Sequence, residues 1–457
     1  MLEFAYRVYH KNKLIVMEES VVNEVNNISQ MAEEIRRKYT NLLNEKCMEK
    51  RIYKEKKRDR PDGPFQRDFS RIMYASSFRR LQGKMQLLGI RPDQFFRNRL
   101  THSLEVSQIA RSIACMAKYS LGETYVVEAG SLSHDIGNPP FGHSGERKLN
   151  ELFKEIGGFE GNAQTLRILK SLERKKPNFD GLNLTYRTLF SVVKYFKKQI
   201  CGKDETTGEI LYNSKFIYDE DYEILKKFID EHDVMVRTFD VQIVDIADAI
   251  AYAAHDLEDG LRQKCYTIEE ILHDYHALYG CSDSYKKLAK IVNKAREDSG
   301  FGKKNVDSSE YSKMFRQELS SKIINVLIND LGICHVSEEF VKKTGTMHKK
   351  ELGFIQYGEL AEGLKEITFK CINHNDEVYS YEKRGNIVIE KLVDIYRNDC
   401  KLLPPEYQVD KKNRENNSDI EKEQDRLICD YVSGMMDSYA ILQYEKYTGK
   451  TFDKIEV

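Results

Sequence analysis

Hydrophobic residues recur at helical spacing along most of the 457-residue chain. The segment RNRLTHSLEVSQIARSIACMAKY, for example, predicts a helix with one buried face. That face carries Leu104, Ile109, Ile113 and Met116. Similar patterns run through FSRIMYASSFRRLQGKMQL, TYVVEAGSLSHDIG and most of residues 266–400, and only 8 prolines interrupt the chain. The pattern therefore predicts an all-α protein.

Polar stretches divide this helical pattern. A charge-rich connector ends at residue 62, and a polar loop over residues 403–422 precedes a last helix, DRLICDYVSGMMDSYAILQYEKY. Residues 173–183 and 201–215 are expected to be exposed, the second as a small β-hairpin insertion. We predict three parts: an N-terminal helical extension with its connector, a helical core, and a mostly helical C-terminal region that completes the site or an oligomer interface. They span residues 1–62, 63–265 and 266–457.

Composition narrows the class of protein. Lys and Arg total 72 and Asp and Glu total 73, a balance that argues against a chain that mainly coats nucleic acid, although it does not exclude a local basic groove. The nine cysteines are scattered without a CxxC pair, so we expect reduced thiols and no zinc ribbon. We find no convincing signal peptide and no run of about 18 apolar residues. These features predict a cytoplasmic protein without a membrane segment.

Candidate chemistry is concentrated in SLSHDIGNPPFGHSGE. Its His134–Asp135 pair lies at the end of an apolar helix, before a loop that Pro139 and Pro140 keep out of helix. Imidazole nitrogen and carboxylate oxygen together suit a divalent transition metal. On spacing alone, such a pair is more often the polar end of a helix than a metal site.

Two further features favour a metal centre. His102 lies inside the amphipathic segment RLTHSLEV, and the nearly all-apolar helix VQIVDIADAIAYAAHDLEDGL carries Asp245, Asp248 and Asp256. A buried carboxylate needs a partner, which a bound cation supplies but which Arg or backbone amides also supply. Asp248, Tyr252 and Asp256 fall at i, i+4 and i+8, and so share one face. Both interpretations remain open at this point.

Six segments, taken together and in this order, resemble a known family. They are RDFSRIMYASSFRRLQGKMQL, RNRLTHSLEVSQIARSIA, SLSHDIGNPPFGHSGE, FEGNAQTLRIL, SVVKY and DIADAIAYAAHDLEDGL. The chain is similar here to the HD-domain deoxynucleoside triphosphate triphosphohydrolases, specifically the bacterial deoxyguanosine triphosphate triphosphohydrolases (dGTPases). The resemblance covers roughly residues 65–262 and implies an HD-domain helical core with additional N- and C-terminal helices.

The resemblance also implies roles for individual residues. The family's metal ligands map onto His102, His134, Asp135 and Asp248, and the last is preferred to Asp245 because a Tyr and an acid follow it by four and eight residues. The catalytic histidine and its acidic partner map onto His143 and Glu146 in the loop after the HD pair. The substrate-binding residues map onto Gln86, Arg99, Asn138, Lys194, Tyr195, Tyr252 and Asp256.

The implied activity is the hydrolysis of a deoxynucleoside triphosphate, dGTP foremost, to a deoxynucleoside and inorganic triphosphate, with Mn²⁺ or Mg²⁺ as cofactor. Relatives form homo-tetramers or homo-hexamers, and a regulatory dNTP or single-stranded DNA is a further expected partner. Two alternatives remain. The first is an HD phosphohydrolase acting on a cyclic nucleotide or an alarmone, and the second is a catalytically inactive scaffold that senses nucleotide or single-stranded DNA.

Overall fold

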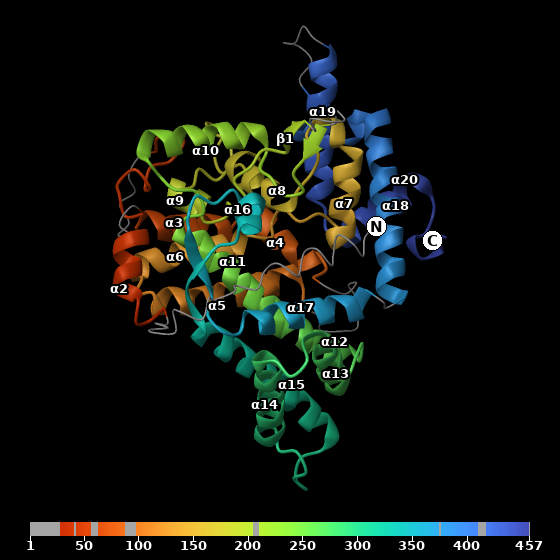
Figure 1. The fold of residues 1–457 in the computed structure, drawn as a ribbon. Coiled ribbons are helices and arrows are strands. Elements are labelled where there is room, and N and C mark those ends of the chain that lie inside the picture. The colour runs from red at the N-terminus through yellow and green to blue at the C-terminus, as the bar shows by residue number, and fades with distance from the viewer. Residues whose placement is uncertain are drawn as a thin grey trace.

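The computed structural model describes residues 28–40, 43–55, 63–86, 97–203, 210–373, 376–409 and 417–456. Most of the N-terminal helical extension and connector predicted over residues 1–62 lies outside these ranges. Within them helices dominate, and four short strands form two antiparallel two-stranded sheets (Figure 1). The predicted hairpin is present as β1 (Ile200–Lys203) paired with β2 (Ile210–Tyr212). The all-α class with a small hairpin is therefore confirmed.

The central layer consists of α3 (Pro64–Met73), α5 (Arg99–Met116), α6 (Leu121–Ser133) and α11 (Phe239–Ala251), which pack on one another (Figure 1). Asn98 and Thr101 form a capping box at the start of α5, and Ser120 and Glu123 form one at the start of α6. The apolar character of α11 matches its position, because ten of its 13 residues are buried. These helices carry the residues of the candidate site.

The sequence pattern predicted one continuous helix over VQIVDIADAIAYAAHDLEDGL. In the structure, the α-helix is interrupted after α11. A π-helical turn, Tyr252–Asp256, joins α11 to α12 (Leu257–Gln263). Such turns are frequent at functional sites because they re-aim side chains relative to the α-helical phase. Here the turn packs against α15 (Ser308–Asn329) and α17 (Gly358–Asn373).

The chain after α12 forms a helical projection and a second hairpin. Helices α13 (Ile268–Tyr279) and α14 (Asp283–Asp298) lie with one end of α15 at the bottom of Figure 1. Strands β3 (Leu331–His335) and β4 (Lys350–Phe354), joined through α16 (Glu338–Thr344), pair beside α11. The sequence pattern did not predict this second hairpin.

The C-terminal helices build a second hydrophobic core with α7 (Gly142–Leu152). They are α18 (Asp376–Asn398), α19 (Asn417–Ser433) and α20 (Asp437–Thr448), which stand beside α7 in Figure 1. The prediction of a single last helix is wrong, because one helix ends at Ser433 and another begins at Asp437. Asp437 accepts hydrogen bonds from the backbone N–H groups of Met85 and Phe141, and this long-range contact places α20 separately from α19.

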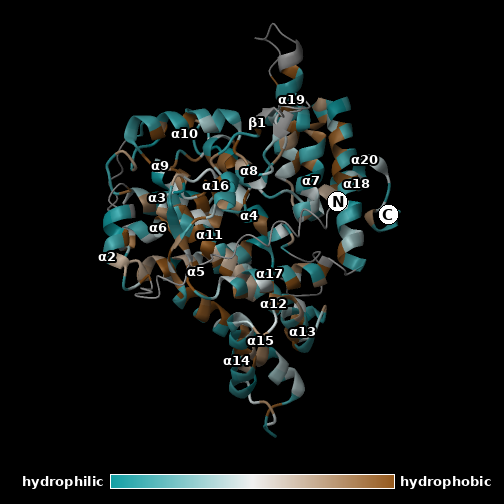
Figure 2. Cartoon of the chain, viewed as in Figure 1, coloured by the Kyte–Doolittle hydropathy of each residue, from teal (hydrophilic) through white to brown (hydrophobic). Residues whose placement is uncertain are grey.

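Two burial predictions are also corrected. Leu104 is 50% exposed although Ile109 and Ile113 are buried, because α5 turns a different face to α6 and α11. In the segment expected to be exposed over residues 173–183, Phe179 and Leu182 are buried. The general pattern holds, with hydrophobic faces inside and hydrophilic ones outside, as along α10 (Asp219–His232) in Figure 2.

The remaining described helices are short. They are α2 (Ala32–Ile35), α4 (Ser76–Arg80), α8 (Gly161–Arg167) and α9 (Tyr186–Phe190), with additional single turns between them. Among the helices of the described ranges, none combines the length and the apolar character needed to cross a membrane.

Candidate active site

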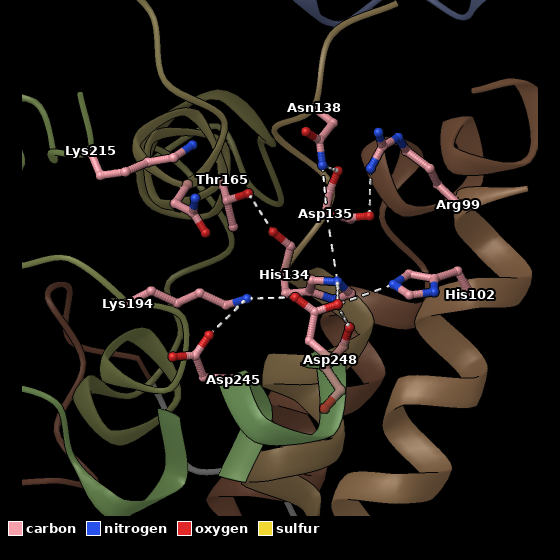
Figure 3. A network of polar contacts seen from close by, with 12 residues as sticks. Arg99, His102, His134, Asp135, Asn138, Thr165, Lys194, Lys215, Asp245 and Asp248 are labelled. Atoms are coloured by element: carbon pink, nitrogen blue, oxygen red, sulfur yellow. Dashed lines mark hydrogen bonds and ion pairs between the residues drawn. The ribbon is translucent and has the colours of Figure 1, made fainter. Parts of the chain in front are cut away.

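Four side chains from three helices converge on one another (Figure 3). His102 comes from α5, the His134–Asp135 pair from the end of α6, and Asp248 from α11. Ligand atoms of His102, His134 and Asp135 all lie within 4.8 Å of one another. Asp248 Oδ1 lies 3.2 Å from His102 Nε2 and 3.3 Å from His134 Nε2. The structure therefore brings together the four residues expected to be ligands.

The orientation of His134 fits metal binding. Its Nδ1 lies 2.6 Å from the carbonyl oxygen of Ser131, which can only accept, so Nδ1 carries the proton and donates. Its Nε2 is buried beside Asp248 Oδ1, at 3.3 Å, and receives no hydrogen bond from the described residues. An imidazole nitrogen with a free lone pair, beside a second imidazole and two carboxylates, is a donor set that suits a divalent transition metal.

The two carboxylates of this cluster are held ionised by their neighbours. Arg99 donates to Asp135 Oδ2 at 2.7 Å, and Lys194 donates to Asp248 Oδ2 at 2.8 Å. Burial opposes ionisation, but His134 and Arg99 bring the pKa of Asp135 well below its usual value. Burial likewise opposes ionisation of Asp248, and Lys194 and His134 lower its pKa. Both anions are thus available to a cation at physiological pH.

Asp245 occupies a different position from Asp248. Its carboxylate accepts from Arg237 at 3.0 Å and lies 3.4 Å from Lys194, on the far side of that lysine from the imidazoles (Figure 3). Burial raises its pKa, but Lys194 and Arg237 lower it overall to about 2. The geometry favours Asp248 over Asp245 as the metal ligand. Tyr195, the next residue after Lys194, is half-buried beside this group.

A second cluster contains His143 and Glu146. Both belong to the N-terminal part of α7 rather than to the preceding loop, so helical spacing brings His143 Nδ1 to 3.1 Å from Glu146 Oε2. Glu146 Oε1 accepts from Lys215 and from the backbone N–H of Gly161, each at 3.2 Å, and Lys215 also pairs with Glu160 at 2.7 Å. Burial opposes ionisation, but Lys215 and His143 lower the pKa of Glu146. Glu146 is therefore an oriented anion beside an exposed imidazole.

The two clusters adjoin one another at Gly161. A Cβ at this position would lie 3.2 Å from Asn138 Oδ1 and 3.8 Å from Glu146 Oε1. Asn138 in turn donates to Asp135 Oδ1 at 2.6 Å. One substrate molecule could therefore contact both the His–Asp cluster and the His143–Glu146 pair.

Unpartnered polar atoms lie around this centre. Both amide atoms of Gln86 and Oδ1 of Asp256 are buried without a hydrogen-bond partner among the described residues, as expected of groups that meet a ligand. The ring of Tyr252 lies 5.1 Å from that of His102, and Lys365 Nζ stands 4.7 Å above the Tyr252 ring. Tyr252 therefore lies directly against an imidazole of the His–Asp cluster.

Asp256 provides a prediction about pH. Burial and the nearby Asp259 raise the pKa of Asp256 from 3.8 to about 8, so the folded protein holds a proton that the unfolded chain releases near pH 4. Its contribution to stability therefore falls as pH rises from about 4 to about 8, by at most about 1.4 kcal/mol per pH unit. We expect the free energy of unfolding of Asp256→Asn to be less pH-dependent in this window. Urea unfolding at several pH values measures this free energy. An equal pH dependence in the parent protein and in Asp256→Asn would contradict the prediction.

Several supporting residues were not assigned a role from the sequence. Lys215 and Thr165 act through tertiary contacts, the latter by donating to the carbonyl of His134 and accepting from Gly137 N–H. The buried Lys84 donates to the carbonyls of Asn138 and Ser433. Asp437, as described above, holds the backbone at Phe141. Because each contact joins segments far apart in the chain, spacing alone could not reveal it.

Removing the Asp437 carboxylate gives a prediction about stability. Asp437→Ala leaves the buried N–H groups of Met85 and Phe141 without their acceptor, which we expect to cost about 1–3 kcal/mol. Denaturant unfolding measures this loss. The matched control is Asp453→Ala, which removes a side chain that is 87% exposed and should change stability by less than about 0.5 kcal/mol. An equal effect of both variants would contradict the proposed anchoring.

Comparison with known proteins agrees with this geometry. Residues 99–253 match the family model of the HD domain, and residues 356–446 match that of the phosphohydrolase-associated domain. Deoxyguanosinetriphosphate triphosphohydrolase-like protein 2 of Vibrio cholerae is 44% identical over 390 residues, covering 84% of this chain and 88% of the relative. The deoxyguanosinetriphosphate triphosphohydrolase-like protein of Bartonella quintana is 33% identical over 391 residues, with the same coverage.

A third relative extends the same result. The deoxyguanosinetriphosphate triphosphohydrolase-like protein of Wolinella succinogenes is 32% identical over 396 residues, covering 84% of this chain and 94% of the relative. The predicted resemblance is confirmed over a much longer stretch than the segments that first indicated it. The chain therefore belongs to the deoxyguanosinetriphosphate triphosphohydrolase-like family of HD-domain phosphohydrolases.

Proposed function

We propose that the protein hydrolyses a deoxynucleoside triphosphate, dGTP foremost, to a deoxynucleoside and inorganic triphosphate. The observation that carries this proposal is the adjacency of the His102–His134–Asp135–Asp248 cluster and the His143–Glu146 pair. The first is suited to hold the phosphate end through a cation, and the second is suited to proton transfer. The names of the relatives support the choice of substrate.

The proposed metal ligands are His102, His134, Asp135 and Asp248, with Mn²⁺ or Mg²⁺ as the ion. A bound ion would neutralise the charge that develops at the α-phosphate. The chain contributes further positive charge through Arg99, whose planar guanidinium suits phosphate oxygens, and through Lys194. Arg99 pairs with Asp135 and Lys194 pairs with Asp248, so these two side chains also fix the carboxylates of the proposed ligands in place.

The reaction needs two proton movements: the attacking water loses a proton, and the leaving 5′-oxygen gains one. Water attacks the α-phosphorus, the bond to the 5′-oxygen breaks, and that oxygen takes up a proton as the deoxynucleoside leaves. His143 is the proposed donor: it is exposed to an incoming substrate, and Glu146 holds its Nδ1, which leaves Nε2 to face the leaving oxygen. Lys215 and the Gly161 N–H fix Glu146 for this role.

The remaining residues are proposed to select the sugar. Tyr252 lies against His102, where it would pack beside the deoxyribose and leave no room for a 2′-hydroxyl. Gln86 and Asp256, with their unpartnered buried atoms, would hold the 3′-hydroxyl. Asn138 would keep Asp135 oriented while the substrate binds.

Product analysis tests the proposal. The purified protein with Mn²⁺ or Mg²⁺ should release deoxyguanosine and triphosphate from dGTP, and a panel with dATP, dCTP, dTTP, GTP, a cyclic nucleotide and an alarmone should rank dGTP first. Release of pyrophosphate or orthophosphate would refute the cleavage position. A preference for the cyclic nucleotide or the alarmone would overturn the assignment of a deoxynucleoside triphosphate as the substrate. An absence of turnover with every nucleotide of the panel would favour a sensing scaffold.

A further inference from the structure

The proposed metal ligand His102 has a second ring nitrogen whose surroundings are unexplained. Nε2 faces Asp248, whereas Nδ1 is buried and has no hydrogen-bond partner among the described residues. An imidazole that offers the lone pair of Nε2 to a metal must carry its proton on Nδ1. That proton needs an acceptor, because a buried donor without one costs about 1–3 kcal/mol.

Two residues outside the metal cluster stand close to this imidazole. Glu105, one turn further along α5, and His255, in the π-helical turn, offer ligand atoms within 4.8 Å of His102 and of each other. His255 is buried, and its Nδ1 lies 3.2 Å from Glu105 Oε2. The proposed mechanism assigns no role to Glu105 or to His255.

Arg97 holds this pair in place. Its guanidinium donates to both carboxylate oxygens of Glu105, at 2.6 and 3.0 Å, and to the backbone carbonyl of His255 at 3.2 Å. It also pairs with Asp259 at 2.6 Å, which fixes the guanidinium from the other side. The arrangement ties the N-terminal part of α5 and the residue just before it to the π-helical turn, and it leaves Glu105 facing His255.

We propose that His255 and Glu105 are positioning residues for the metal centre. When a metal is bound, Glu105 would accept the N–H of His255 Nδ1, which lies 3.2 Å from its carboxylate but makes no hydrogen bond within the described structure. Nε2 of His255 would then keep its lone pair and accept the N–H of His102 Nδ1, which has no partner among the described residues. This chain fixes the tautomer and the ring orientation of His102 and directs its Nε2 at the metal. The π-helical turn has a purpose in this arrangement, because it aims His255 at α5 while Tyr252 and Asp256 remain at the substrate site.

The inference rests on the proposed metal ligands, and its test measures metal binding rather than turnover. Outer partners of this kind typically change metal affinity by 10–100-fold. We expect His255→Phe, which keeps an aromatic ring but has no acceptor, to weaken Mn²⁺ binding by that factor in a titration followed by the electron paramagnetic resonance of free Mn²⁺. His255→Gln, whose amide oxygen can accept the same proton, should recover most of the loss.

Two further variants make the outcome decisive. Gln108→Ala alters an exposed residue one turn beyond Leu104 on the same helix and should bind Mn²⁺ like the parent protein. His102→Ala should lose Mn²⁺ binding, and if it does not, the assigned metal site is wrong. If His102→Ala loses binding while His255→Phe binds like the parent, the positioning role alone is overturned.

A loss of folding is separated from a loss of affinity by thermal unfolding without metal. If His255→Phe does not fold, His255→Leu, which also lacks an acceptor, takes its place in the comparison with His255→Gln. Equal Mn²⁺ affinity of the Leu and Gln variants would overturn the proposal, because it would show that the acceptor atom is irrelevant.

Discussion

Replacing Asp248 by alanine is expected to abolish Mn²⁺ binding and to reduce the rate of triphosphate release by at least about 10³-fold. The reason is that the interaction between a bound metal ion and the reacting phosphate stabilises the transition state by several kcal/mol. Asp248 is the one carboxylate that lies within 3.3 Å of Nε2 of both His102 and His134 in the described structure. Without it, the two imidazoles and Asp135 retain a weaker and more open donor set. Isothermal titration with Mn²⁺ and product analysis with dGTP measure the two losses.

The neighbouring Asp245 is the matched control. Asp245→Ala removes a carboxylate from the same helix that also contacts Lys194, but one that faces Arg237 rather than the imidazoles. Mn²⁺ binding should therefore persist in this variant. In Asp248→Ala, Lys194 keeps Asp245 as a partner, so the protein should remain folded by circular dichroism. Loss of Mn²⁺ from Asp245→Ala with retention in Asp248→Ala would reverse the assignment of the ligand.

Removing the proton donor is expected to separate catalysis from metal binding. His143→Gln should lower the turnover rate by about 10²–10⁴-fold, the usual contribution of general acid–base catalysis, without a change in Mn²⁺ affinity. The reason is spatial: within the described residues, the His143–Glu146 pair adjoins the metal cluster through Gly161 and Asn138. Steady-state kinetics and a Mn²⁺ titration on the same preparation measure both effects.

Glu146→Gln refines this second prediction. The amide still fills the space between His143 and Lys215 but no longer carries the charge that orients and stabilises the protonated imidazole, so we expect an intermediate loss in turnover rate. Arg147→Ala, which removes a neighbouring side chain that is 69% exposed, should leave the rate unchanged. Wild-type turnover in His143→Gln would require another proton donor.

The site shows how far local pattern reaches. The His134–Asp135 pair, the apolar helix around Asp248 and the spacing of His143 and Glu146 were all visible in the sequence, because each depends on residues within a turn or two of one another. The resemblance then joined these pieces in the correct order. Whether the predicted roles hold is for the variants above to decide.

Other features depended on contacts that local pattern does not record. The hairpin of β3 and β4, the break between α19 and α20, and the exposure of Leu104 each follow from how distant elements pack. The π-helical turn at Tyr252–Asp256 also differs from the regular helix that the apolar pattern predicted. Periodicity reports which face of a helix is apolar on average, but not which neighbour covers it.

The sequence by itself determined the helical class, the hairpin of β1 and β2, the family and the candidates for the metal site. Hydrophobic spacing and short motifs are local properties, so they can be read without coordinates. Only the tertiary structure showed that Asp245 faces Arg237, that Lys215 holds Glu146, and that Asp437 anchors the loop at Phe141. Such pairings join residues up to about three hundred positions apart, and the packing of the whole chain selects them.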